Sequence, residues 1–241
     1  MTNGMILAAG FGKRLRPLTD TTPKPLIPIG PSTCLDRAVH DLMAVGSQKI
    51  VINTHHLADQ IHQHVHEYYP QVIISHEPDI LETGGGILKA SPYFGDEPFF
   101  VLNGDIWRQD EGAPALKRLE TFFDLKEMDI LLLVVPKEKA IGYTGRGDYF
   151  LGEDDRLVYR GDNAHAPYVH SGAYMMRASL FNVPFVIPVE KAFSVMTIFH
   201  QVEKEKRLFG LVHQGSWGDI GTPEGLADVR KTRSLKESLP T

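Results

Sequence analysis

Short apolar runs alternate with amphipathic stretches along the whole chain, which is the pattern of strands alternating with helices. Strands are predicted at residues 5–9, 49–53, 72–75, 99–102, 130–135, 168–176 and 208–212, with a hairpin formed by 149–151 and 157–159. Helices are predicted at residues 33–45, 57–69, 86–91, 116–125 and 190–205, and a last one follows Pro223. Alternation of this kind predicts an α/β fold with a mostly parallel sheet flanked by helices.

The chain of 241 residues is long enough to bury one good hydrophobic core. It contains no linker rich in Gly, Pro and Ser, no low-complexity tract and no internal repeat. We therefore expect a single domain, residues 1–241, with one lobe at 1–110 and a second at 111–241. Residues 142–161 are rich in Gly and Asp and contain short β-like pieces, so the second lobe should be β-rich.

Charge and cysteine content limit the partners of the protein. A net charge of −5 gives no basic surface for nucleic acid, so any binding of phosphate has to be local. The single Cys34 cannot form an internal disulfide or a cysteine zinc site, which favours a buried thiol in a reducing compartment. With no membrane-spanning apolar run and no secretion signal, we expect a soluble cytoplasmic protein.

A glycine-rich turn followed by cations comes directly after the first predicted strand. Gly10 and Gly12 leave backbone amides accessible to an anion, while Lys13, Arg14 and Lys24 supply positive charge on a proline-stiffened loop. Neither the Walker pattern nor the G-x-G-x-x-G dinucleotide pattern is present. A bare G-x-G is usually an ordinary turn, but with these cations the loop favours a site for a nucleoside triphosphate.

Two further motifs contain candidate binding residues. Three glycines end the segment 77–86, and before a helix they would leave a bare surface for a flat base, or simply a flexible helix entrance. Asp105 and Asp219 each follow a glycine and are candidates for a Mg²⁺ pair, although isolated aspartates of this kind are often turn residues. His62 and His66, four residues apart on a predicted helix, are interpreted as a solvated face rather than a metal site.

The string L-A-A-G-x-G-x-R-L-x-P-L-T followed by P-K-P-L resembles the signature of sugar-1-phosphate nucleotidylyltransferases. Within this family the chain is most similar to the N-acetylmuramate-1-phosphate uridylyltransferases of bacterial cell-wall recycling. The similarity rests on the motif LETGGGI, on the N-G-D that ends a strand, and on the absence of a C-terminal hexapeptide-repeat extension. The resemblance implies a Rossmann-like mixed, mostly parallel sheet, the nucleotide-diphospho-sugar transferase fold, with a small β-rich sugar-binding lobe. It also makes residues 1–110 mainly a nucleotide-binding half and residues 111–241 mainly a sugar-binding half.

The resemblance also implies roles for particular residues. Arg14 and Lys24 would be catalytic, and Asp105 and Asp219 would bind Mg²⁺. The nucleotide would contact Ala8, Ala9, Gly10, Gly12, Lys13, Arg14, Glu77, Glu82, Thr83, Gly84, Gly85, Asn103 and Gly104. The sugar would contact Gly142, Tyr143, His170, Ser171, Gly172 and Glu190.

The expected reaction joins a sugar 1-phosphate to a nucleoside triphosphate, releasing pyrophosphate. The Glu82 carboxylate only accepts hydrogen bonds, so it suits uracil, thymine or guanine, each of which offers a ring N–H. UTP with N-acetylmuramate 1-phosphate is favoured, and mannose-1-phosphate guanylyltransferase is the alternative enzyme. His170 and Tyr143 depart from the Asn-hydroxyl-Gly and Gly-Glu patterns of many glucose-1-phosphate relatives. A nucleotide-sensing regulatory module is the non-enzyme alternative, and a monomer or weak dimer is expected.

Overall fold

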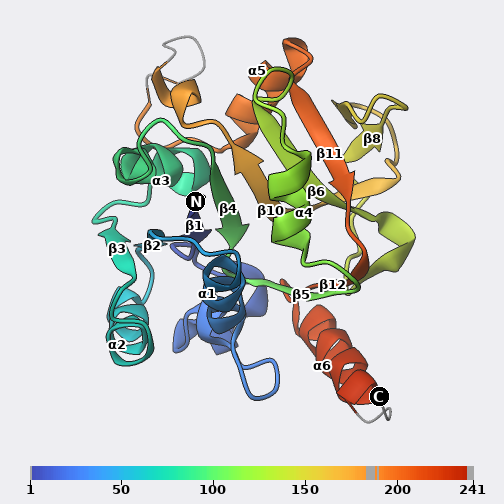
Figure 1. Ribbon diagram of the computed structural model, residues 1–241. Helices are drawn as coiled ribbons and strands as arrows, with labels where there is room; N and C mark the ends of the chain where they lie inside the picture. The colour runs from blue at the N-terminus through green and yellow to red at the C-terminus, as the bar shows by residue number, and fades with distance from the viewer. Residues whose placement is uncertain (1, 183–187, 189, 238–241) are drawn as a thin grey trace.

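The computed structural model describes residues 2–182, 188 and 190–237, and its described part is organised around a nine-stranded sheet (Figure 1). Seven strands follow the order β11-β6-β10-β4-β1-β2-β3, while β8 and β9 extend it beside β10. Because β10 is antiparallel to both β4 and β6, the other six strands of this path run in one direction. The bounds are β1 Asn3–Leu7, β2 Ile50–Thr54, β3 Ile73–His76, β4 Phe99–Asn103, β6 Ile130–Pro136, β8 Tyr149–Leu151, β9 Leu157–Tyr159, β10 Tyr168–Met176 and β11 Leu208–Val212.

Helices pack on both faces of this sheet, because alternate side chains of a strand point to opposite faces. Ile130 and Leu132 of β6 share a core with Phe199 of α5, whereas Leu131, between them, belongs to a second core with Leu119 of α4. The bounds are α1 Cys34–Ala44, α2 Ala58–Tyr68, α3 Glu82–Ala90, α4 Ala115–Phe122, α5 Met196–Lys204 and α6 Pro223–Glu237.

A small second sheet lies beside the first, with the order β5-β12-β7. Its strands are β5 Ile106–Asp110, β7 Ala140–Ile141 and β12 Gly215–Asp219. Its buried Trp107 packs with Ile27 from the loop after β1 and with Val229 of α6. In Figure 1 the pair β5 and β12 runs between α1 and α6.

Most predicted elements are confirmed. The predicted strands at 149–151, 157–159, 168–176 and 208–212 coincide with β8, β9, β10 and β11. Helix α1 begins after Thr33, where the Thr33 hydroxyl accepts from the Asp36 amide and the Asp36 carboxylate accepts from the Thr33 amide.

Two predicted helix starts were wrong, and three strands were missed. The helix predicted from residue 190 begins at Met196, and the one predicted from residue 86 already begins at Glu82. Strands β5, β7 and β12 were not predicted, since their few apolar positions give no strand pattern.

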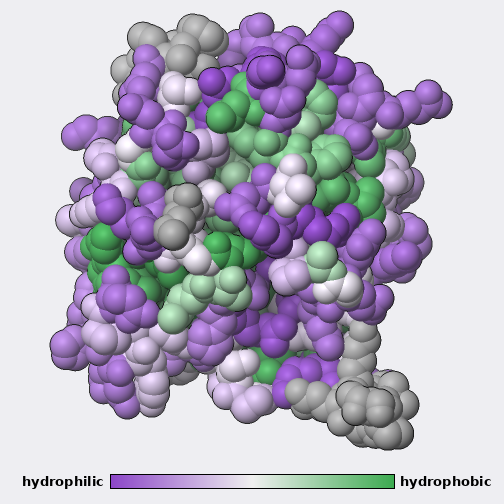
Figure 2. All heavy atoms as spheres, viewed as in Figure 1, coloured by the Kyte–Doolittle hydropathy of each residue, from purple (hydrophilic) through white to green (hydrophobic). Residues whose placement is uncertain are grey.

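Polar and charged residues cover most of the face drawn in Figure 2, and apolar side chains lie on it in separate patches. Within the described ranges, no helix is long and apolar enough to cross a membrane. The buried Cys34 is a free thiol, and burial raises its pKa to about 12, so it remains protonated and unreactive.

Candidate functional site

Three adjoining cavities lie at the carboxyl ends of β1 and β4, and Asp105 lines all three. Ligands of open α/β sheets gather at this edge because strand ends and their loops leave a crevice there. We call them the loop cavity, the α3 cavity and the β10 cavity, with volumes of about 290, 160 and 380 Å³.

The loop cavity brings together the glycine turn and the cations that follow it. Gly12 has φ +62°, and a Cβ there would lie 2.8 Å from the Thr19 side chain, so only glycine suits this turn. Lys24 is only 8% exposed, yet its ammonium reaches the cavity. The lining residues are Leu7, Ala8, Gly10, Gly12, Lys13, Arg14, Lys24, Pro25, Asp105 and Gly221.

The α3 cavity opens at the N-terminus of α3. Glu82, the first residue of this helix, has φ 57°, a left-handed conformation that costs about 1 kcal/mol for a residue with a side chain. This geometry places an exposed carboxylate at the cavity wall beside Thr83. The lining residues are Leu7, Ala9, Gly10, Asn53, Ile80, Glu82, Thr83, Asn103 and Asp105.

A buried polar chain connects the first two cavities. The Ala8 amide donates to Asn53 Oδ1 at 2.8 Å, and Asn53 Nδ2 donates to Glu77 Oε1 at 2.8 Å. The other oxygen of Glu77 accepts from the Leu81 amide at 3.0 Å. Glu77 is 0% exposed and lines none of the three cavities, so its predicted contact with the nucleotide stays a prediction. It instead fixes the loop before α3 relative to the glycine turn.

The three glycines of the α3 motif lie inside the helix and are buried, which corrects the prediction of a bare surface before a helix. A Cβ at Gly84 would lie 2.3 Å from the Phe193 ring, and one at Gly85 would lie 2.2 Å from the Lys191 carbonyl oxygen. The amides of Gly84 and Gly85 both donate to the Phe193 carbonyl. Close packing of residues 191–193 therefore requires glycine at 84 and 85, while Gly86 packs against Asn53 and Glu77.

The second sheet brings Asp105 and Asp219 to one place although 114 positions separate them in the chain. Strands β5 and β12 are antiparallel, and Asp219 lies opposite Ile106, the residue directly after Asp105. Both carboxylates line the β10 cavity. Each also lies near a predicted catalytic cation: Lys24 Nζ is 2.6 Å from Asp105 Oδ2, and Arg14 Nη1 is 3.9 Å from Asp219 Oδ2.

The donor set of this pair fits Mg²⁺. The two side chains are 31% and 16% exposed, so carboxylate oxygens are accessible from the cavity. Mg²⁺ prefers one or two carboxylates and completes its octahedron with water and substrate phosphate oxygens. Across the described residues, no cluster of three or more His, Cys, Asp or Glu side chains could hold a metal. A metal here would accordingly depend on phosphate oxygens from a ligand.

The β10 cavity is lined by aromatic and apolar side chains together with a few polar groups. Tyr143, His170 and Asp148 supply the polar groups on the side away from the glycine loop. The lining residues are Arg14, Lys24, Asn103, Asp105, Ile106, Tyr143, Asp148, Tyr149, Tyr159, Val169, His170, Met196, Trp217 and Asp219.

His170 is held between rings, with Tyr174 and Phe199 at centroid distances of 5.5 and 5.7 Å. Its backbone amide donates to Asp148 Oδ2 at 2.8 Å, and its buried Nδ1 has no hydrogen-bond partner among the described residues. Burial lowers the pKa of His170 to about 4, so the ring is neutral at physiological pH. Burial also raises the pKa of Asp148.

Four residues predicted to contact a sugar do not line the β10 cavity. The Ser171 side chain is 1% exposed, and its hydroxyl accepts from the Ala173 amide. Gly172 has φ +80° and packs on the Asn103 side chain, while Gly142 has φ +71° and packs on the Asp219 carbonyl. Glu190 is exposed. For Ser171, Gly172, Gly142 and Glu190 the sugar contact therefore stays a prediction, without support from the lining of the β10 cavity.

Gly104 also acts through packing. Its amide donates to the Leu7 carbonyl at 2.9 Å, and a Cβ there would lie 3.0 Å from that oxygen. Asn103, the residue before it, lines both the α3 cavity and the β10 cavity.

Sequence reasoning missed several lining residues. Asn53 is the penultimate residue of β2 and lies opposite Leu7 of β1, and its place near the carboxyl end of a parallel strand was the signal that could have identified it. Asp148 directly precedes the predicted strand at 149–151, but nothing local indicated that it is half-buried at a cavity. Two histidines on α2 lie in different surroundings. His62 Nε2 lies 2.9 Å from Thr54 Oγ1, whereas His66 is exposed.

Comparison with known proteins agrees with this geometry. The family model for nucleotidyl transferases matches residues 3–234. The N-acetylmuramate alpha-1-phosphate uridylyltransferase of Caulobacter vibrioides is 30% identical over 227 residues, covering 91% of this chain and 92% of that protein. The enzyme of the same name from Neisseria meningitidis is 31% identical over 224 residues, covering 90% and 92%.

A solved structure supports the fold. The inositol-1-phosphate CTP transferase from T. maritima superposes with a TM-score of 0.77 at 19% identity, covering 100% of this chain and 98% of that one. A mixed sheet with three cavities at its strand ends, together with a family match across nearly the whole length, establishes what the chain is. The chain belongs to the nucleotidyl transferase family and is a sugar-1-phosphate nucleotidyltransferase enzyme.

Proposed function

We propose that this enzyme transfers a uridylyl group from UTP to N-acetylmuramate 1-phosphate, forming the UDP-sugar and pyrophosphate. The observation that carries this proposal is the junction of the three cavities at Asp105. Such an arrangement suits a base in the α3 cavity, a triphosphate in the loop cavity and a sugar phosphate in the β10 cavity. The α-phosphorus would then lie at the junction, beside Lys24 and Asp105.

The proposed reaction needs positioning and charge compensation more than a base. An oxygen of the sugar phosphate, already ionised near neutral pH, attacks the α-phosphorus. The bond from that phosphorus to the oxygen bridging the β-phosphorus breaks, and pyrophosphate leaves with the electron pair. Lys24 lines both the loop and β10 cavities, so its ammonium can offset negative charge on the α-phosphoryl group.

The other residues of the loop cavity would hold the leaving group. Arg14 lines both this cavity and the β10 cavity, and its guanidinium offers a bidentate grip on phosphate. Asp105 and Asp219 would hold Mg²⁺, which when bound supplies charge neutralisation between the phosphate oxygens. The free buried thiol of Cys34 agrees with a proposed location in the cytoplasm.

Two features support the choice of substrates. Glu82 places an acceptor at the α3 cavity, where uracil can donate its ring N–H. The β10 cavity, at about 380 Å³, pairs aromatic walls with the neutral His170, which suits an amino-sugar ring.

Pyrophosphate release tests the proposal. The purified enzyme is incubated with Mg²⁺, UTP or GTP, and one of three sugar phosphates: N-acetylmuramate, N-acetylglucosamine or mannose 1-phosphate. We expect release with UTP and N-acetylmuramate 1-phosphate. Release confined to GTP and mannose 1-phosphate would instead identify a guanylyltransferase. Release with UTP and only a different sugar would retain the chemistry and refute the sugar assignment.

A further inference from the structure

The β5–β12 ribbon connects the two proposed metal carboxylates to a partly buried ionic network at its opposite end. Asp105 and Asp219 lie at one end, where Asp219 is opposite Ile106. At the other end Asp110 is opposite Gly215, and Arg108 is opposite Trp217 in between. Any tilt of this ribbon would therefore move both carboxylates together, relative to Lys24 and Arg14 of the loop after β1.

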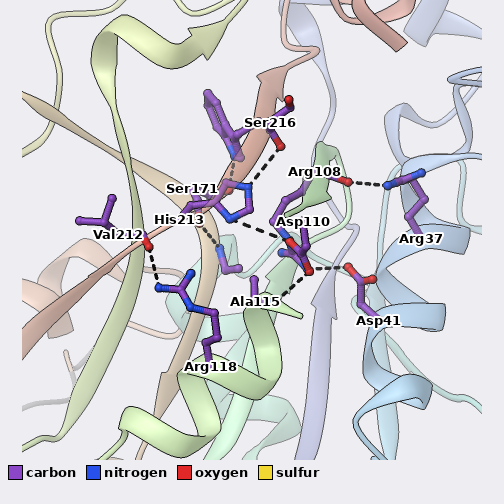
Figure 3. A network of polar contacts seen from close by, with 12 residues as sticks. Arg37, Asp41, Arg108, Asp110, Ala115, Arg118, Ser171, Val212, His213 and Ser216 are labelled. Carbon is purple, nitrogen blue, oxygen red and sulfur yellow. Dashed lines mark hydrogen bonds and ion pairs between the residues drawn. The ribbon is translucent and has the colours of Figure 1, made fainter. Parts of the chain in front are cut away.

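Arg108 joins the ribbon to helix α1 (Figure 3). Its side chain is 9% exposed, and it donates to two carboxylates: Nη2 to Asp41 Oδ2 at 2.5 Å and Nε to Asp110 Oδ1 at 3.1 Å. Asp41 belongs to α1, as does Arg37, whose guanidinium donates to the Arg108 carbonyl. Side chain and backbone of one residue thus hold β5 against the same helix.

The remaining contacts of the network fix the far end of the ribbon. Asp110 Oδ2 accepts from the Ala115 amide at the start of α4, at 2.8 Å. His213 Nε2 lies 3.2 Å from the Ser216 carbonyl of β12, and its Nδ1 is 3.9 Å from Asp110 Oδ1. Burial lowers the pKa of His213, so the charged groups here are the guanidinium groups of Arg37, Arg108 and Arg118 and the carboxylates of Asp41 and Asp110 (Figure 3). Trp217 ties β12 to β10 by donating to the Ser171 carbonyl at 2.8 Å.

We propose that Arg108 is a positioning residue that holds Asp105 and Asp219 in place beside the loop cavity for Mg²⁺ by fixing the β5–β12 ribbon against α1. Arg108 lines none of the three cavities, so its proposed role runs through the ribbon rather than through contact with a ligand. This inference rests on the proposed function, because it requires the two aspartates to bind the metal. Residues that orient metal ligands typically change metal affinity about 10- to 100-fold when replaced.

The test measures metal binding directly rather than turnover. Mn²⁺ is titrated into the enzyme in the presence of α,β-methylene-UTP, a non-hydrolysable analogue, and free Mn²⁺ is counted by electron paramagnetic resonance. We expect Arg108→Met to weaken Mn²⁺ binding about tenfold. Affinity for the analogue without metal should remain unchanged. Arg108→Lys should recover part of the loss. Lysine keeps the positive charge, but its single ammonium lacks the planar set of donors with which the guanidinium bonds both carboxylates.

A matched control removes an ion-paired arginine elsewhere. Arg177 Nη1 lies 3.0 Å from Asp129 Oδ1, away from the ribbon, so Arg177→Met should leave Mn²⁺ binding unchanged. Should Arg108→Met fail to fold, Asp41→Asn provides the test, since it removes the negative charge of the Arg108 partner on α1 and leaves the ion pair with Asp110. Its expected weakening is about threefold, smaller than for Arg108→Met.

Asp105→Asn separates failure of this inference from failure of the proposed function. Loss of Mn²⁺ binding in Asp105→Asn, with wild-type binding in the folded Arg108 and Asp41 variants, would overturn the positioning role and retain the metal pair. Wild-type Mn²⁺ binding in Asp105→Asn would overturn both.

Discussion

Lys24 Nζ lies 2.6 Å from Asp105 Oδ2, so the proposed catalytic cation and the proposed metal ligand are ion-paired with each other. Lys24 is 8% exposed, and a buried ammonium without a partner is costly. Asp105 therefore holds the Lys24 ammonium at the cavity junction before any phosphate arrives. In the proposed complex the α-phosphoryl group would pair with Lys24, and Mg²⁺ would pair with Asp105.

Replacing Lys24 by Met should lower kcat about 10²- to 10³-fold, because one preorganised charge at the transferring phosphoryl group is lost. The Mg²⁺ concentration for half-maximal rate should not rise, since Asp105 is released from its ion pair. Single-turnover rates across a Mg²⁺ titration measure both quantities. A raised Mg²⁺ requirement with normal kcat would show that Lys24 acts through the metal site instead.

Base selectivity should depend on Glu82. Glu82→Gln adds a donor at the α3 cavity, so the preference for UTP over CTP in kcat/KM should fall at least about tenfold. Asp79→Asn is the matched control, because Asp79 is an exposed acid three residues upstream that does not line the cavity. Equal selectivity in wild type and Glu82→Gln would exclude Glu82 as the base acceptor.

Stability at low pH should reflect His170. The ordinary pKa of 6.5 is lowered to about 4 in the fold, so between these values the unfolded chain binds a proton that the folded protein does not. The free energy of unfolding should therefore fall as pH falls from 6.5 to 4, by at most about 3 kcal/mol from this group.

Urea unfolding at several pH values measures this effect by comparison with His170→Gln. The variant lacks the His170 contribution, so the difference between the two proteins should change with pH over this window. His66→Gln, at an exposed histidine of α2, provides the control. Parallel pH profiles for wild type and His170→Gln would contradict the burial argument.

Gly86 should tolerate no side chain. A Cβ there would lie 2.7 Å from both Asn53 Nδ2 and Glu77 Oε1, the bonded pair of the buried polar chain. Gly86→Ala should lower the free energy of unfolding by about 1–3 kcal/mol. The control is Gly152→Ala, whose Cβ would closely approach only the Asp154 carboxylate on an exposed turn and should cost less than about 0.5 kcal/mol. Equal stability of the two variants in urea would contradict the packing argument.

Local pattern was sufficient where a segment determines its own structure. Thr33 and Asp36 indicate where helix α1 begins, because their reciprocal hydrogen bonds need only neighbouring residues. Strand β10 is apolar enough to be recognised as a strand without knowledge of its partners. The cations of the glycine loop were likewise readable, because Lys13 and Arg14 directly follow the turn they serve.

Distant partners decided what the sequence did not reveal. Strand β12 reads Gly-Ser-Trp-Gly-Asp and becomes a strand through its pairing with β5, over 100 positions away. Gly84 and Gly85 suggest a helix break because glycine costs about 1 kcal/mol in a helix. They are helical nonetheless, since Phe193 and Lys191 pack where their side chains would be. Glu77 was predicted to contact a ligand, because the sequence around it does not show that Asn53 and Leu81 hydrogen-bond to its carboxylate.

The most direct test of the account is pyrophosphate release by Asp105→Asn with UTP, N-acetylmuramate 1-phosphate and Mg²⁺. Asp105 lines all three cavities and pairs with Lys24, so loss of its charge should lower the rate about 10³-fold. Circular dichroism should show an unchanged fold. A wild-type rate in the folded variant would contradict the central role of Asp105 in catalysis.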